Sequence, residues 1–152
     1  MTNRTSVCLT LSTIALILIV ALIDRPSPID PGPRLEDRQA KILDLIWKLE
    51  SDRQLDVPDG QHGEIGPLQI TEAYFLDALQ FEPRLQGHHY YECRELAFAK
   101  EVVAAYMRRW VPTAWQTAEA ETIFRTHNGG PRGKSKNATL RYWEKARSLL
   151  GR

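Results

Sequence analysis

The sequence predicts a mainly α-helical domain that follows an apolar N-terminal segment. From residue 35 onward, apolar residues recur at helical spacing through most of the chain. The stretch 52–66 is the exception, because it is polar and interrupted by proline and glycine. A chain of 152 residues suits one domain with a core. We therefore expect one helical domain over residues 35–152, with a small irregular β-hairpin in the stretch 52–66.

Residues 1–23 read as a signal peptide or membrane anchor. Arg4 precedes a run from Val7 to Ile23 that is apolar except for three hydroxyl residues. This length lies between a signal-peptide core and a minimal membrane span of about 20 residues. We expect the segment to export the domain, either being removed or anchoring it to the inner membrane. Residues 24–34 contain four prolines and predict a stiff linker.

The helix predicted over residues 41–51 carries the first candidate for chemistry. Ile42, Ile46 and Leu49 follow the spacing of a core-facing helix, and Glu50 lies where this apolar stripe ends. Apolar neighbours and the negative end of the helix dipole both disfavour a charged carboxylate. Glu50 is thus a candidate general acid, although a solvated glutamate at a helix end gives the same pattern.

Further helices follow in order. Thr71 caps a short helix, and 95–110 is the clearest helix of the chain, ending before Pro112. Another helix begins near Thr117 and runs into the turn 127–133. The last helix starts near Thr139.

Charge and cysteine content exclude several classes of function. The 20 basic and 19 acidic residues give no basic field for nucleic acid. Cys8 falls in the apolar run, so Cys93 alone cannot build a disulfide framework or a zinc site. The adjacent His88 and His89 point apart in a predicted loop, so we expect neither a metal nor a cofactor. We expect a monomer.

Three stretches then resemble a known superfamily when they are taken together. They are Glu50-Ser51, the segment Gly66-Pro-Leu-Gln-Ile70, and the turn His127-Asn-Gly-Gly130. Their order and separation resemble the motifs of lytic transglycosylases of the SLT type and of goose-type lysozymes. The closing runs 124–131 and 138–143 look closer still to a bacterial subgroup of small lysozyme-like domains. The resemblance covers most of 42–150.

The resemblance implies a lysozyme-like fold that cleaves the β-1,4 bond between N-acetylmuramic acid and N-acetylglucosamine in peptidoglycan strands. Glu50 would be the catalytic acid, and Ser51 would help to fix its carboxylate. Gln69 would line the cleft floor. The substrate-binding candidates are therefore Ser51, Gln69, His127, Asn128 and Gly129. The site of action would be the cell envelope or periplasm.

Two departures from the family pattern concern the acid. Arg53 follows closely and could pair with Glu50, which would favour the carboxylate over the acid. His127 stands where many relatives carry tyrosine. A charged imidazole there would also favour the ionised carboxylate of Glu50 over the acid.

A lysozyme that works by two carboxylates needs a second one about 5 to 9 Å from the first, so the type of mechanism depends on whether such a group is present. The candidates in the loop after Glu50 are Asp52, Asp56, Asp59 and Glu64, and Glu64 is the best placed. A lytic transglycosylase needs no such group, and we favour that mechanism at this point. The alternatives are a hydrolytic lysozyme or chitinase-type glycosidase that uses Glu64, or an inactive wall-binding module.

Overall fold

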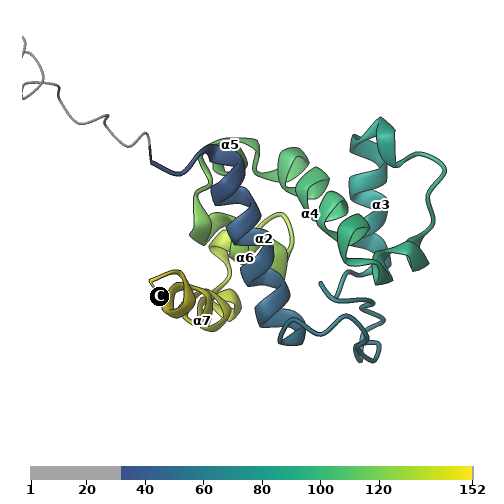
Figure 1. Ribbon diagram of the computed structural model, residues 1–152, viewed down its shortest axis with the longest axis horizontal. Helices are drawn as coiled ribbons and strands as arrows, with labels where there is room; N and C mark the ends of the chain where they lie inside the picture. The colour runs from purple at the N-terminus through teal and green to yellow at the C-terminus, as the bar shows by residue number, and fades with distance from the viewer. Residues whose placement is uncertain (1–31, 152) are drawn as a thin grey trace, which may run out of the picture. The chain divides into compact units, whose positions relative to one another are not determined.

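A computed structural model describes residues 32–151 of the chain (Figure 1). The predicted signal or anchor segment and most of the linker lie outside the described residues. Within residues 32–151, no helix is long and apolar enough to cross a membrane. The longer helices are α2 (Leu35–Ser51), α3 (Glu72–Phe81), α4 (Leu96–Trp110), α5 (Pro112–Thr117), α6 (Ala120–Gly129) and α7 (Leu140–Leu150). Short 3₁₀ turns are η1 (Pro83–Leu85), η2 (Tyr90–Arg94), η3 (Gly133–Ser135) and η4 (Asn137–Thr139).

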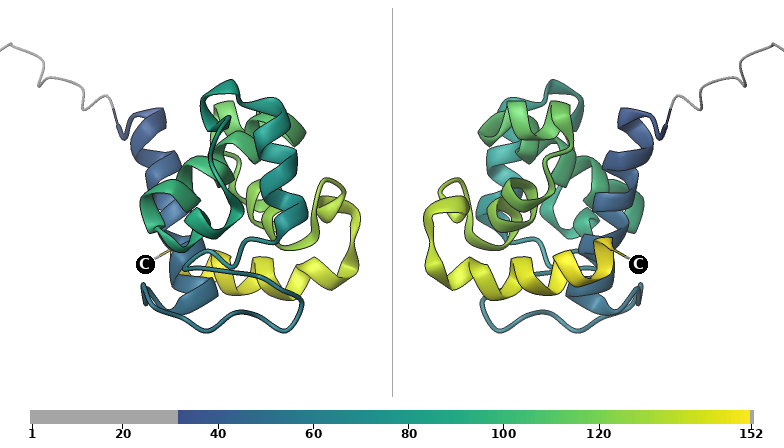
Figure 2. Two further views of the ribbon diagram at one scale, coloured as in Figure 1. Left: turned by 90° about the vertical axis from the view of Figure 1, so that its right-hand side faces the viewer. Right: turned by 90° about the vertical axis from the view of Figure 1, so that its left-hand side faces the viewer.

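Helix α2 packs against α5 and α7. On one side of it, α3 packs against α4, while α7 packs against α6 and against α2 itself. Figure 1 shows the α3–α4 pair on the right and α7 at the lower left, and Figure 2 shows α7 in yellow running back toward α2. The last turn of α2 therefore has neighbours from distant parts of the chain.

The predicted end of α2 is confirmed. Ile42 and Ile46 are buried in the core, as the helical spacing requires. The helix ends after Ser51 because Asp52 and Arg53 both adopt left-handed backbone angles, φ 53° and 64°. The Asp52 N–H donates to the carbonyl of Lys48, which closes the last turn. Glu50 thus lies on a defined final turn.

Helices α3 and α4 also match their prediction. The Thr71 hydroxyl accepts a hydrogen bond from the Tyr74 N–H at 3.3 Å, as expected of a helix cap. In α4, Val102, Val103 and Tyr106 are buried on one stripe. Trp110, at the end of the same stripe, remains 38% exposed.

The predicted hairpin in residues 52–66 is not confirmed. Among residues 32–151 no strand forms, and the only β pairing is an isolated antiparallel bridge between Ile65 and Ile70. Gly66 and Gln69 between them have positive φ, 71° and 47°, so the chain turns back too tightly to extend the pairing. The result is one closed turn that presents Gln69 next to Glu50.

Candidate active site

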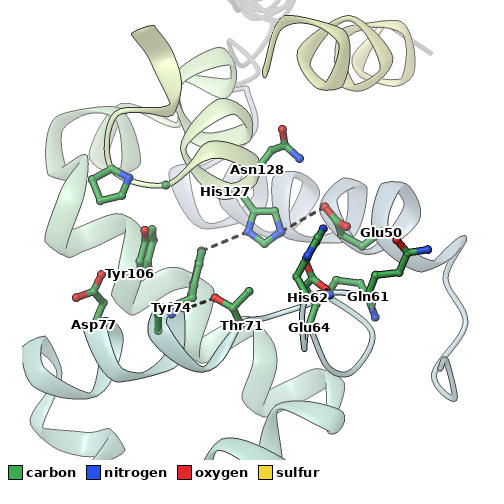
Figure 3. A pocket seen from close by; sticks show the side chains of 14 residues that line it. Glu50, Gln61, His62, Glu64, Thr71, Tyr74, Asp77, Tyr106, His127 and Asn128 are labelled. Atoms are coloured by element: carbon green, nitrogen blue, oxygen red, sulfur yellow. Dashed lines mark hydrogen bonds and ion pairs between the residues drawn. The ribbon is translucent and has the colours of Figure 1, made fainter. Parts of the chain in front are cut away.

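A cleft of about 620 Å³ opens beside the last turn of α2 (Figure 3). Its walls come from α2, the loop 60–69, α3, α4 and the end of α6. The side chains around it include Glu50, Gln61, His62, Glu64, Gln69, Thr71, Tyr74, Asp77, Tyr106, His127 and Asn128. This volume falls in the usual range for small-molecule sites, although the lining is more polar than is common.

The Glu50 carboxyl group is held at one oxygen. Tyr142 of α7 donates its hydroxyl to Oε1 at 2.6 Å, and Nε2 of His127 lies 3.5 Å from the same atom. Oε2 accepts no hydrogen bond from any residue between 32 and 151. Because the side chain is only 19% exposed, this arrangement fixes its direction and leaves one oxygen available to a ligand in the cleft.

Both tyrosines near the carboxyl group keep their protons. Burial, followed by the charge of Glu50, raises the pKa of Tyr142 well above its ordinary value. Burial also raises the pKa of Tyr74, with further contributions from Tyr106 and Glu50. The two hydroxyls therefore remain hydrogen-bond donors over the whole range in which a lysozyme-like site would work.

His127 connects Glu50 to the aromatic wall of the cleft. Its side chain is 4% exposed, and its Nδ1 lies 3.3 Å from the Tyr74 hydroxyl. The Tyr74 ring stacks on Tyr106, with centroids 3.5 Å apart and planes inclined by 13°. Figure 3 shows the row from Tyr74 through His127 to Glu50. His127 thus lies beside the Glu50 carboxyl group, and Tyr142 supplies a hydroxyl to it.

Arg53 points away from the acid. Its guanidinium pairs with Asp44, nine residues earlier on α2, and not with Glu50. The carboxylate of Asp52 pairs with Lys48 in the same way. Arg53, which follows Glu50 closely in the sequence, is thus paired with a different carboxylate.

Glu64 lies on the wall of the same cleft. Its Oε2 accepts the His62 N–H at 3.0 Å, and the Gly60 N–H donates to the Glu64 carbonyl at 2.8 Å. A Cβ on Gly60 would lie 2.2 Å from Oε2, so the carboxylate rests directly on the glycine backbone. Residues 60–62 of the same turn thus hold the Glu64 carboxylate in place.

The other loop carboxylates occupy different surroundings. Asp59 pairs with Arg94 through both oxygens, at 2.7 and 2.8 Å, and Arg94 holds the pKa of Asp59 below its usual value. Asp59 lines a second hollow that adjoins the first and shares Glu50, Gln61 and Gln69 with it.

Ser51 and Gln69 support the site in different ways. The Ser51 hydroxyl donates to the carbonyls of Trp47 and Gln54, at 3.1 and 3.2 Å, so it stabilises the end of α2 and not the carboxylate itself. Gln69 lines both hollows, and its amide donates to the Gly66 carbonyl at 3.0 Å.

At the end of α6, some residues line the cleft and others pack against the rest of the domain. Asn128 is exposed and lines the cleft together with Gly130. Gly129 faces the other way, since a Cβ there would lie 2.4 Å from the Thr139 side chain. Gly129 therefore allows the close packing of α6 on η4, and the predicted substrate contact at this residue finds no support in the geometry.

Sequence reasoning missed Tyr74 and Tyr142 as parts of the site. Tyr74 lies on the short helix predicted after Thr71, and Tyr142 lies within the run 138–143. No local signal separates a core tyrosine from one whose hydroxyl meets a carboxylate, because the partner lies 92 residues away in the case of Tyr142.

Comparisons with known proteins identify relatives of this chain. A family model described as Destabilase matches residues 40–149. A lysozyme of Magallana gigas is 36% identical over 94 residues, which cover 58% of this chain and 65% of that protein. Invertebrate-type lysozyme 6 of Caenorhabditis elegans is 32% identical over 120 residues, covering 70% and 83%. The chain thus matches just under two thirds of the length of the Magallana gigas protein.

A solved structure shares the fold. A chain in the crystal structure of Aeromonas hydrophila PliI in complex with Meretrix lusoria lysozyme superposes with a TM-score of 0.60 and 30% identity, covering 73% of this chain and 89% of that one. The lysozyme-like part of the predicted resemblance is confirmed, whereas these matches give no support to the narrower assignment to SLT-type or goose-type transglycosylases. The chain belongs to the Destabilase family.

Proposed function

We propose that the domain is a lysozyme-type glycoside hydrolase that cleaves the β-1,4 bond between N-acetylmuramic acid and N-acetylglucosamine in peptidoglycan. The observation that carries the proposal is the carboxyl group of Glu50, which accepts the Tyr142 hydroxyl at Oε1, lies 3.5 Å from Nε2 of His127, and lines the cleft. The names of the relatives, lysozyme and invertebrate-type lysozyme, support the same activity.

In this proposal Glu50 donates its proton to the glycosidic oxygen as the bond to the sugar carbon breaks. A second carboxylate then either activates a water molecule or bonds to the sugar carbon, according to its distance from the first. Glu64 is our candidate, because it lines the same cleft as Glu50. Gln69 and Asn128 would contact the sugars.

Asp59 is the competing candidate for the second carboxylate. Its pairing with Arg94 keeps it ionised to lower pH than an isolated aspartate, and an ionised group is what the second role requires. It lines the hollow on the other side of Glu50, so substrate lying across both hollows would meet it.

The test is digestion of purified peptidoglycan sacculi by the full chain, followed by mass spectrometry of the products. Reducing sugar ends are expected, while 1,6-anhydromuramic ends would show that the protein is a lytic transglycosylase. Glu50→Gln should lower the rate at least 100-fold. Glu36→Gln, an exposed substitution in the first turn of the same helix, is the matched control. Undiminished cleavage by Glu50→Gln would contradict the assignment of the acid.

A matched pair of substitutions distinguishes the two candidates for the second carboxylate. Glu64→Gln should reduce the rate by about 100-fold or more, and Asp59→Asn by much less. The opposite order would transfer the role to Asp59. Chitooligosaccharides tested beside sacculi would identify a chitinase-type substrate, and binding to sacculi without release would identify a wall-binding module.

We also propose that the substrate lies outside the cytoplasm. The apolar run from Val7 to Ile23 supports export, and residues 24–34 would then act as the spacer between this segment and the domain over 35–152.

A further inference from the structure

The protonation of His127 decides whether it supports or opposes an acid at Glu50. A cationic imidazolium next to a carboxyl group favours the ionised carboxylate, whereas a neutral ring that donates an N–H orients the group with a weaker electrostatic effect. Both roles are compatible with the 3.5 Å separation between Nε2 and Oε1. The difference must come from whatever contacts the other ring nitrogen.

The other ring nitrogen faces Tyr74. The Tyr74 hydroxyl lies 3.3 Å from Nδ1, and this is its only hydrogen bond within residues 32–151. Tyr74 is buried, stacks on Tyr106, and meets the His127 ring edge-on at a centroid distance of 5.6 Å. Among residues 32–151 the phenol therefore has no other hydrogen-bond acceptor to turn toward.

Two arrangements of the shared proton are possible. If Tyr74 donates to Nδ1, the neutral ring carries its proton on Nε2 and presents it to Glu50. If Nδ1 is protonated instead, the buried phenolic proton has no acceptor among the described residues. A buried unpaired donor costs about 1–3 kcal/mol, which favours the first arrangement. The raised pKa of Tyr74 ensures that its proton is present to be donated.

We propose that Tyr74 is a positioning residue that holds His127 in the neutral form protonated on Nε2. The proposal rests on the proposed function only for its catalytic consequence. Glu50 then receives two neutral donors, the Tyr142 hydroxyl and the His127 N–H, and its proton is carried on the free Oε2. The groups around the ring are Glu50 of α2, Tyr74 of α3 and Tyr142 of α7; Asp77, Tyr106, His62 and Glu64 line the same cleft.

The first test measures the tautomer directly. The full chain has four histidines, so ¹⁵N spectra of histidine-labelled protein at pH 8 can be assigned by substitution. The native spectrum should show an unprotonated Nδ1 and a protonated Nε2 at His127. Tyr74→Phe keeps the ring but removes the hydroxyl, and should produce a mixture of the two tautomers. Tyr106→Phe removes the other hydroxyl of the stacked pair and should leave the His127 signals unchanged.

The proposal is overturned if His127 carries its proton on Nδ1 in the native protein, or if Tyr74→Phe leaves the tautomer unchanged. These spectra need no substrate. A protein with the expected tautomer but no activity on sacculi would contradict the proposed function and leave the role of Tyr74 intact.

The second test separates a neutral donor from a cation. His127→Gln supplies an uncharged amide that can donate to Glu50 and accept from Tyr74, and it should keep kcat within about tenfold of the native value. His127→Ala removes the donor and should reduce kcat by about 100-fold, with KM changed much less. If Gln fails as completely as Ala in a folded protein, a charged imidazolium is required and the proposal is wrong.

Discussion

Two walls face each other across the cleft, and they are held by different forces. The wall formed by the end of α6 is backed by buried contacts: the Arg125 side chain is 8% exposed, and it donates to Glu121, to the Thr139 hydroxyl and to the Lys136 carbonyl. The opposite wall, the loop 52–66, relies on exposed ion pairs such as Asp59 with Arg94, whose side chains are about half exposed.

The difference between the two walls indicates which carboxyl group is held most rigidly. Buried hydrogen bonds resist rearrangement because breaking them leaves an unpaired group away from water. Exposed ion pairs contribute little and are weakened by salt. Glu50 belongs to the buried wall through Tyr142 and His127, whereas Glu64 and Asp59 belong to the looser one. We therefore expect a precisely oriented acid opposite a loop that adapts to the substrate.

The largest effect should come from Gly66, where the loop joins the core. Its φ is 71°, and a Cβ would lie 2.1 Å from the Cys93 carbonyl oxygen, so Gly66→Ala combines backbone strain with a clash. We expect a loss of about 4 kcal/mol in the free energy of unfolding, measured by urea denaturation.

Gly63→Ala is the control for Gly66. Its φ is 82°, but nothing lies within 4 Å of the added Cβ. We therefore expect Gly63→Ala to lower the free energy of unfolding by about 1 kcal/mol, from backbone strain alone. Equal losses at both positions would show that the loop is no better anchored at Gly66 than at its tip.

The next largest effect tests the buried wall. Arg125→Met removes three hydrogen bonds and leaves the Lys136 carbonyl and the Thr139 hydroxyl without this donor. We expect about 3 kcal/mol of destabilisation in the same denaturation experiment. Little change in unfolding free energy would mean that packing alone holds α6 against the turn 133–139.

A smaller effect is expected when one donor to Glu50 is removed. Tyr142→Phe keeps the ring but deletes the 2.6 Å hydrogen bond. The kcat on sacculi should fall about tenfold, because a hydrogen bond between neutral groups contributes up to about 1.5 kcal/mol. Tyr91→Phe, at an exposed tyrosine of η2, is the matched control. Unchanged kcat in Tyr142→Phe would show that His127 is sufficient to hold the acid.

The smallest effect belongs to the exposed wall. Arg94→Met removes the partner of Asp59, and the thermal midpoint at neutral pH should change little. Because Arg94 lowers the pKa of Asp59, the stabilisation exists above the ordinary pKa of aspartate and is lost as the pH falls through the lowered one. The native and variant midpoints should therefore converge in strong acid. A large difference at neutral pH would place this loop among the firmly held parts.

Much of the helical framework was predictable from local signals. The spacing of Ile42 and Ile46, the cap at Thr71 and the stripe containing Val102 depend on neighbours within a few turns, and all three agree with the structure. The hairpin failed as a prediction because polar composition and glycines signal only that the chain leaves the helix. Whether strands then pair depends on backbone angles at Gly66 and Gln69, and Gly66 lies against the backbone of Cys93, far along the chain.

The sequence by itself determined most of the helices, although not α5, and the order of three motifs, and hence which carboxylate lies at the end of α2. Only the tertiary structure decided what surrounds that carboxylate. It turned Arg53 toward Asp44, and it brought Tyr142 and His127 to Glu50 from the far end of the chain. Such contacts depend on how α6 and α7 pack against α2, and no periodicity along the chain encodes which hydroxyl will meet which carboxylate. Glu50 was recognisable from the sequence as a candidate acid, but the direction of its carboxyl group and the residues around it are defined only by the tertiary structure.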